Sequence, residues 1–204
     1  MTADALRFPT LAAYLRSLPE GLSSHPSAQI KGAVLRDVNL PQSLAGAPGL
    51  PREVGELLLR PPPASIWFPE VHFHALLHAV YDHSYGSTRA VEYQQWTTAG
   101  TRALLTSPLY RIAFMLITPA RLMRSLQSRW ELLRRGTELQ LDHGDESSCL
   151  LRIKHPLALY SDLHRRTRAA TLRTVIECAG GKSVTTRIAS VTLLSWQVLC
   201  KWEP

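Results

Sequence analysis

Cysteine pairs, long apolar runs and export signals are scarce or missing in this sequence, and each gap excludes a class of protein. Only three cysteines occur in 204 residues, and no two are spaced as Cys-x-x-Cys. This odd number, without a metal-ligand spacing, favours reduced and mostly buried thiols in a cytoplasmic protein over a disulfide framework. The N-terminus lacks the apolar core of a secretory signal. No apolar run approaches the roughly 20 residues that cross a bilayer, so we predict no membrane span.

Catalytic motifs are missing as well. The chain has no Gly-x-Ser-x-Gly elbow, no phosphate-binding glycine loop and no dinucleotide fingerprint. The segment Gly180-Gly181-Lys182-Ser183 resembles a phosphate loop in composition. However, it ends a predicted helix and enters a strand, the reverse of the order that points amide N–H groups at phosphate. We therefore predict that the protein is not an enzyme.

The net charge of +7 is unevenly distributed along the chain. Residues 1–99 carry seven Lys/Arg and eight Asp/Glu, whereas residues 100–204 carry sixteen and eight. Arginine faces on two predicted helices, with Arg121 and Arg124 on one and Arg165 and Arg166 on the other, would suit phosphates or an acidic protein partner. No helix-turn-helix, zinc-finger or RNA-binding motif accompanies them. Nucleic-acid association is therefore only a second alternative.

Helical periodicity dominates the first two thirds of the chain. Apolar residues recur at helical spacing, which predicts helices over residues 10–18, 52–60, 69–81, 89–105, 108–117 and 119–135. Thr118-Pro119 is a typical helix start, because a hydroxyl cap precedes a proline at the first position. Gly136 is a typical helix end.

After Gly136 the apolar period changes from helical to two. Residues 137–142 and 148–154 alternate and predict a hairpin, a long helix covers 157–179, and strands cover 183–192 and 195–202. One side of the last predicted strand carries Trp196, Val198, Cys200 and Trp202. This order predicts an α+β fold, with a helical N-terminal and central part packed on an antiparallel sheet and a ββαββ C-terminal half. We assign residues 1–29 to an extension with a linker, and 30–204 to a single domain.

With these elements in place, the chain resembles a family of myxobacterial proteins of about this length. The matching segments are Lys31-Gly32-Ala33-Val34, Gly100, Thr118-Pro119-Ala120-Arg121-Leu122, Trp130 and Trp202. The order of elements over about residues 30–204 is also similar to the fold group of the vinyl-reductase-type ligand-binding domain and the haem nitric-oxide-binding domain. That group includes vesicle-tethering subunits that bind partners or acyl chains. The resemblance implies a sensory or partner-binding module.

A candidate metal site lies on the helix predicted over residues 69–81 and just beyond it. Glu70, His74, His78 and Asp82 are spaced four residues apart, which stacks them on one helix face. Two histidines at this spacing can grip a metal, and a carboxylate can complete the site or orient an imidazole. The alternative is an amphipathic helix whose histidines form hydrogen bonds with neighbouring protein groups.

The haem family to which the chain is similar suggests a second candidate site. Tyr85, Ser87 and Arg89 match the Tyr-x-Ser-x-Arg pattern that holds the haem propionates in that family. All three side chains can donate hydrogen bonds to carboxylates. The histidine that the family places upstream is missing here, because Glu56 occupies that region.

Two aromatic residues that follow three prolines in a predicted loop are a further candidate site. Trp67 and Phe68 follow Pro61-Pro62-Pro63, where they either cover the core or anchor a partner. Our leading hypothesis is a cytoplasmic, non-enzymatic module without a cofactor. It would bind a protein partner or a second copy, together with a small apolar ligand between residues 109–117 and the Trp196 face. The alternative is a metal- or haem-dependent sensor that uses His74 and His78.

Overall fold

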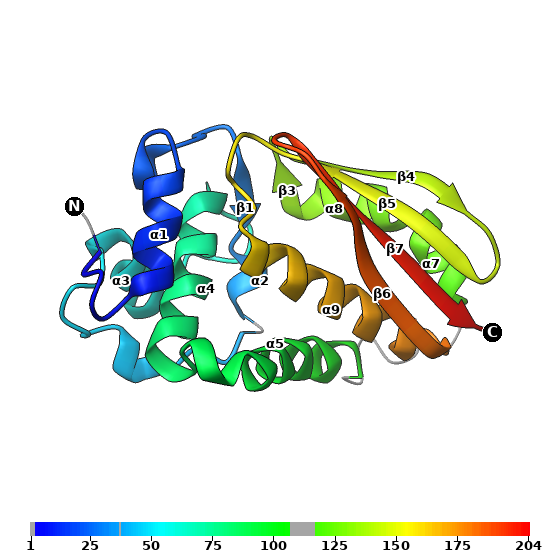
Figure 1. The fold of residues 1–204 in the computed structure, drawn as a ribbon, viewed down its shortest axis with the longest axis horizontal. Helices are drawn as coiled ribbons and strands as arrows, with labels where there is room; N and C mark the ends of the chain where they lie inside the picture. Colours follow the sequence, from blue (N-terminus) through cyan, green and yellow to red (C-terminus); the bar gives the residue numbers. More distant parts are fainter. Residues whose placement is uncertain (1–2, 37, 107–116) are drawn as a thin grey trace. The chain divides into compact units, whose positions relative to one another are not determined.

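The computed structural model describes residues 3–36, 38–106 and 117–204 and divides them into two compact units (Figure 1). The first unit comprises Met1–Tyr93, Leu133–Gly136 and Pro156–Ser161. The second comprises Gln94–Leu132, Thr137–His155 and Asp162–Pro204. The chain thus passes between the units several times. The boundary that we predicted after residue 29 lies within the first unit, which contains the residues on both sides of it.

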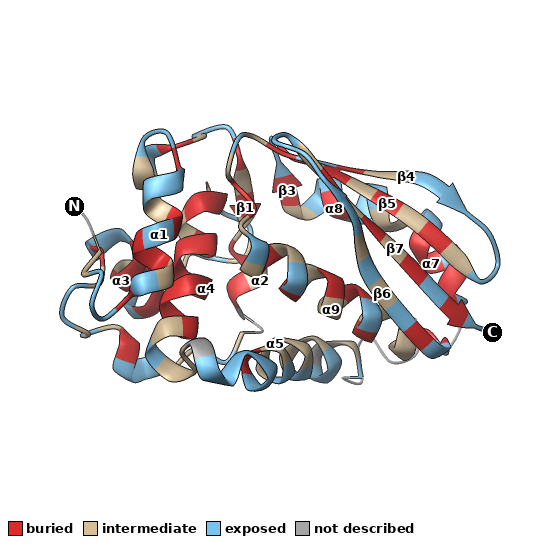
Figure 2. Cartoon of the chain, in the orientation of Figure 1, coloured by how far each residue is buried: buried red, intermediate tan, exposed pale blue. Residues whose placement is uncertain are grey.

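The first unit is built around helix α4, Glu70–Ser84, which is buried along most of its length (Figure 2). Helix α1, Pro9–Ser17, packs against it through Leu11, Ala12 and Tyr14. Part of the predicted extension, helix α1, therefore belongs to the core of this unit. The unit also contains α2 (Ala33–Arg36), α3 (Arg52–Leu59), the start of α5 (Ala90–Leu105) and the 3-10 turns η1 (Gly21–Ser23), η2 (Gln42–Leu44) and η3 (Ser87–Arg89).

A small antiparallel sheet, which the sequence did not predict as a sheet, completes the first unit. Its strands are β1 (Gln29–Lys31), β2 (Trp67–Pro69) and β3 (Arg134–Arg135), in the order β2-β1-β3. Gly136 follows β3 with a φ of +71°, and a Cβ there would lie 2.5 Å from the carbonyl oxygen of Ser27. Only glycine fits this close approach in the left-handed region.

The second unit contains the predicted ββαββ arrangement. Strands β4 (Glu138–Gly144), β5 (Ser148–Lys154), β6 (Lys182–Val191) and β7 (Ser195–Glu203) form an antiparallel sheet in the order β4-β5-β7-β6. Helix α9, Asp162–Cys178, packs on β6 and β7. As predicted, the buried side of β7 carries Trp196, Val198, Cys200 and Trp202. The α+β fold class is confirmed.

Two predicted helices differ from the structure. The helix predicted over 119–135 is divided into α7 (Pro119–Arg124) and α8 (Leu126–Leu133), and its last two residues form β3 instead. The hydroxyl of Ser125 donates to the carbonyl oxygen of Leu122, a local bond that competes with helical backbone pairing. The predicted start of α9 at residue 157 is wrong, because Ala158 has a φ of +60° and the helix begins only at Asp162. The helix predicted over 108–117 falls almost entirely outside the described residues.

Within the described residues, no helix combines the length and apolarity needed to cross a membrane. The three cysteines are free thiols. Cys149 and Cys200 are directly opposed on β5 and β7 and are buried, whereas Cys178 at the end of α9 is partly exposed. The hydrogen bond with Cys149, together with burial, raises the pKa of Cys200. Burial also raises the pKa of Cys178.

These environments predict different thiol reactivities, because only an accessible thiolate reacts. We expect one slow thiol per native chain with the aromatic disulfide reagent DTNB, and all three after denaturation. The Cys178→Ser variant should show none in the native state. Rapid reaction of two or more thiols in the native protein would contradict the buried placement of the β5–β7 pair.

Candidate functional site: the polar face of helix α4

The four polar residues predicted to share a helix face do so in the first unit. Glu70, His74 and His78 are buried, with 0%, 1% and 4% of their surface exposed, and Asp82 is half-buried. Helix α4 begins directly after the edge strand β2, and the backbone N–H of Glu70 donates to the carbonyl oxygen of Ala28 beside β1. The helix therefore starts at a position fixed by the small sheet.

Glu70 forms the acidic end of a buried ion pair with Arg134. The Nε of Arg134 lies 3.0 Å from Oε1 of Glu70, and the hydroxyl of Tyr160 donates to the same oxygen at 3.0 Å. Arg134 reaches Glu70 because β3 pairs with β1, which places Arg134 on the inner face of the small sheet opposite Ile30. Burial disfavours the charge of Arg134, but the charges and hydrogen bonds of Glu70 and Tyr160 together outweigh this and raise the pKa of the guanidinium.

His74 connects α4 to the segment that precedes α9. Its Nδ1 lies 2.9 Å from the carbonyl oxygen of Leu159, which also accepts a hydrogen bond from the hydroxyl of Tyr14 at 3.0 Å. Its Nε2 lies 3.5 Å from Oε1 of Glu70. A carbonyl oxygen can only accept, so His74 holds its proton on Nδ1 when it is neutral. Burial raises the pKa of Tyr14 well above its usual value, which keeps its hydroxyl protonated.

His78 lies in a chain of hydrogen bonds that ends at Asp82. Asp82 accepts from the backbone N–H groups of Thr10 and Leu11 at 3.0 Å and from the hydroxyl of Thr10 at 2.8 Å, so it caps the start of α1. Because the Thr10 hydroxyl donates its hydrogen bond to Asp82, its oxygen accepts one from Nδ1 of His78 at 3.1 Å. Nε2 of His78 then accepts from the hydroxyl of Ser161 at 3.0 Å. These hydrogen-bond directions are those of the neutral imidazole, the form that burial of His78 favours.

The environment of His78 does not favour acid–base catalysis. Burial, with a smaller contribution from the charge of His74, lowers the pKa of His78 to about 3. A Ser–His pair can serve as nucleophile and base, but an effective base has a pKa near the operating pH. A base this weak would leave Ser161 unactivated. The contact between these two side chains is thus better explained as packing support.

The same contacts bear on the predicted metal site. Both ring nitrogens of His78 and Nδ1 of His74 are hydrogen-bonded to protein atoms, and the carboxylates of Glu70 and Asp82 are engaged with Arg134 and Thr10. Across the described parts of the chain, no group of three or more His, Cys, Asp or Glu side chains is placed to hold a metal ion. The geometry matches the other alternative, a helix whose histidines form hydrogen bonds with neighbouring groups. Metal binding here stays a prediction that the geometry does not favour.

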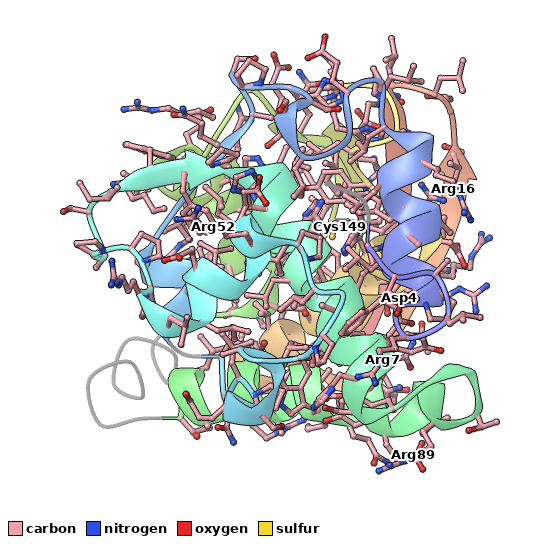
Figure 3. The ribbon with its side chains drawn as sticks, turned by 90° about the vertical axis from the view of Figure 1, so that its left-hand side faces the viewer. Asp4, Arg7, Arg16, Arg52, Arg89 and Cys149 are labelled. Atoms are coloured by element: carbon pink, nitrogen blue, oxygen red, sulfur yellow. The ribbon has the colours of Figure 1, made fainter. Side chains whose placement is uncertain are left out.

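The Tyr-x-Ser-x-Arg motif lies at the surface, just after α4. Arg89 is exposed and projects outward (Figure 3), with its guanidinium 5.5 Å from the ring centroid of Tyr85. It also donates to the carbonyl oxygen of Ser84 at 3.2 Å and lies 3.8 Å from Glu92. The side chain of Ser87 is outside what the structure describes. Tyr85 and Arg89 are thus brought together, with Arg89 already engaged by neighbouring groups.

The residues proposed for partner binding separate into two groups. In the first unit, Phe68 is buried, whereas Trp67 on the same strand is only partly covered. The exposed arginines Arg124 and Arg166 in the second unit form ion pairs with Glu146 at 2.9 Å and with Asp162 at 2.7 Å. These pairs partly neutralise the basic helix faces and so do not favour nucleic-acid binding.

Two other residues of the predicted basic faces have different environments. Arg121 on α7 is exposed. Arg165 on α9 is partly buried, and burial lowers the pKa of its guanidinium. The partner-binding role of these arginines stays a prediction.

Comparison with known proteins gives a match by structure alone. No protein-family model matches the chain, and no curated protein matches it in sequence. An Fe(II) unliganded H-NOX protein from K. algicida aligns with a TM-score of 0.53 and 8% identity over 86% of this chain and 97% of the other. A Cs H-NOX mutant with 4-cyano-L-phenylalanine has a TM-score of 0.55 at 7% identity, with the same coverage. An H-NOX structure solved to probe heme distortion has a TM-score of 0.55 at 7% identity, over 85% and 91%.

The chain has an H-NOX-like fold. The expected relation to the haem nitric-oxide-binding fold group is therefore confirmed at the level of the fold. The resemblance to a myxobacterial family has no support in these comparisons and stays a prediction. Identities of 7–8% carry no functional residue from the neighbours to this chain.

Haem is the group named for one of these neighbours, so its fit to the residues described above can be tested. A haem iron needs an axial side chain with a free donor atom. The two histidines predicted as ligands use their ring nitrogens within the network of Thr10, Ser161 and Leu159. The predicted propionate-binding Arg89 is exposed and engaged with Ser84 and Glu92. The residues predicted to hold haem therefore do not fit that role.

Sequence reasoning missed the residues that complete the network on α4. These are Thr10, Tyr14, Arg134, Tyr160 and Ser161. Only Ser161-Asp162 left a usable signal, because a hydroxyl residue followed by an acid is typical of a helix start. Recognising this signal would have placed the start of α9 at Asp162. Residues 156–161 would then have been predicted as a separate segment, which is the one that contacts α4.

Proposed function

We propose that this chain is a sensory domain that binds a small ligand within an H-NOX-like fold. The observation that supports this most is the extent of the likeness, which covers 86% of this chain and 97% of the K. algicida protein. That structure is described as the Fe(II) unliganded form of an H-NOX protein. The comparison supports the sensor alternative of the sequence analysis more than a purely partner-binding module.

The chemistry of the described site narrows the ligand. The polar side chains on α4 are bonded to groups of other segments, namely Thr10, Arg134, Leu159 and Ser161, so they provide structural support and leave few donor atoms for an iron or a free metal ion. We propose that the domain binds a small apolar ligand in place of haem. His74 and His78 would not contact this ligand through their ring nitrogens. We also propose that the protein has no catalysis of its own. Its three free thiols support a reducing, cytoplasmic environment.

Haem titration distinguishes the two kinds of sensor. We expect haemin added to the purified full chain, made without a histidine tag, to give no stoichiometric Soret band beyond that of free haemin. The spectra of His74→Ala and His78→Ala should match the wild type. A one-to-one Soret band that disappears in either variant would show that the histidines leave their hydrogen bonds to bind iron, and would support the haem-dependent sensor instead.

A second measurement tests the proposal that the chain binds a small ligand of any kind. Native mass spectrometry of the chain purified from its own cells should show a non-covalent adduct that denaturation releases. Metal analysis of the same sample should show no stoichiometric metal. A chain that carries no adduct in native spectra and takes up no haemin would contradict the proposal of a ligand-binding sensor.

A further inference from the structure

The outer face of the small sheet presents an aromatic side chain between two cations. Lys31 on β1 is directly opposite Trp67 on β2, and Arg135 on β3 is opposite Gln29 on β1. Side chains alternate between the two faces of a strand. The buried residues Ile30, Phe68 and Arg134 thus mark the inner face, and Lys31, Trp67 and Arg135 occupy the outer one. We call this set the cationic sheet face.

The indole of Trp67 holds the two cations in place. Nζ of Lys31 lies 5.1 Å from the centroid of the Trp67 ring, and the guanidinium of Arg135 lies 4.1 Å from it. Both distances are within the range of cation–π attraction. Because β2 and β3 lie on opposite sides of β1, they are about 10 Å apart. The side chains of Trp67 and Arg135 therefore meet across β1.

These two cations differ from the arginines that are paired with carboxylates of the chain. Arg102, Arg124, Arg152, Arg166 and Arg173 each form an ion pair with a carboxylate of the chain. Lys31 and Arg135 form none with any carboxylate in the described residues. Beside them, Ile66 keeps 50% of its surface exposed next to Trp67. The face combines two uncompensated positive charges with an adjoining apolar side chain.

We propose that the cationic sheet face binds an acidic polypeptide segment of a protein partner. Lysine and arginine donate charge-assisted hydrogen bonds to carboxylates, and two such cations around one ring match a segment with closely spaced carboxylates. Ile66 adds apolar contact for a side chain between the carboxylates. A nucleotide fits less well, because both cations lie over the indole and compete for the ring surface on which a base would stack. This proposal is independent of the ligand-binding function proposed above.

Fluorescence anisotropy of the full chain with a short fluorescein-labelled peptide of alternating glutamate, alanine and isoleucine tests this interface. We expect binding that weakens between about 0.05 M and about 0.5 M salt, because exposed charges are screened. The analogue with glutamine in place of glutamate should not bind. Lys31→Glu and Arg135→Glu should each weaken binding about tenfold. The milder Lys31→Gln and Arg135→Gln should weaken it less, with unchanged circular dichroism and melting temperature.

Arg102→Glu is the matched control, because it makes the same change in net charge at an exposed arginine of the second unit for which no binding role is predicted. It should leave peptide binding within about twofold of the wild type. Equal losses in Arg102→Glu and Arg135→Glu would attribute binding to net charge and overturn the proposal. Failure to bind the glutamate peptide would also overturn it. The proposal would also be overturned if single-stranded DNA or phosphatidylserine vesicles bound more tightly than the peptide through Lys31 and Arg135. The partner would then be a nucleic acid or a membrane.

Discussion

Replacing Arg134 by methionine should lower the free energy of unfolding by about 3–5 kcal/mol. The reason is that Glu70 would remain as an uncompensated charge at a position where 0% of its surface is exposed. Its ion pair with Arg134 is 3.0 Å long, and the hydroxyl of Tyr160 alone would not replace it. Replacing Glu70 by leucine should cost a similar amount, because the buried guanidinium of Arg134 would then lose its counter-charge.

The double variant provides the sharper test of this buried ion pair. Glu70→Leu with Arg134→Met removes both charges, and replacing a buried pair by apolar side chains of similar size is often close to neutral. We therefore expect urea unfolding to show the double variant more stable than either single variant. Strictly additive losses in this double-mutant cycle would contradict a direct interaction between the two residues.

Arg124→Met is the control for surface ion pairs. The pair between Arg124 and Glu146 has side chains that are 52% and 78% exposed. Water and salt screen such a pair, so its loss should change the unfolding free energy by less than about 1 kcal/mol. A loss as large as that of Arg134→Met would mean that burial does not set the strength of these interactions in this protein.

The stability of the native protein should fall as the pH is lowered from about 7 to about 5, with His78 contributing about 2 kcal/mol of that loss. The ordinary pKa of histidine is 6.5, and burial lowers that of His78 to about 3 in the folded state. Below the ordinary pKa the unfolded chain binds a proton that the native chain does not. Protonation therefore favours unfolding, and the stability is present above pH 6.5 and lost as the pH falls towards 3.

The His78→Gln variant isolates this contribution. Glutamine keeps a side-chain amide near Thr10 and Ser161 but does not titrate in this range. Urea unfolding of both proteins at several pH values should show that the wild type loses about 2 kcal/mol more than the variant between about pH 7 and about pH 5. His72 also has a pKa lowered by burial, but its effect is common to both proteins and cancels. If the free energies of unfolding of the two proteins depended on pH in the same way, His78 would not be buried in its neutral form.

Short-range patterns in the sequence predicted the features that depend on neighbouring residues. Alternation of polar and apolar residues located β5, β6 and β7, because side chains on a strand point to opposite faces in turn. A four-residue spacing placed Glu70, His74 and His78 on one face of α4, because a helix turns once in 3.6 residues. Both relations are fixed by backbone geometry within a few residues.

The sequence alone thus determined the α+β class, the ββαββ order and the shared face of the polar residues on α4. Only the tertiary structure decided what this face contacts. Arg134 is 64 residues from Glu70 along the chain, and Tyr160 is 90 residues from it. Such contacts depend on the pairing of β3 with β1 and on the course of residues 156–161, which no local period encodes. Because those distant groups occupy the histidines and carboxylates, what resembled a set of metal ligands is a hydrogen-bonded network within the protein.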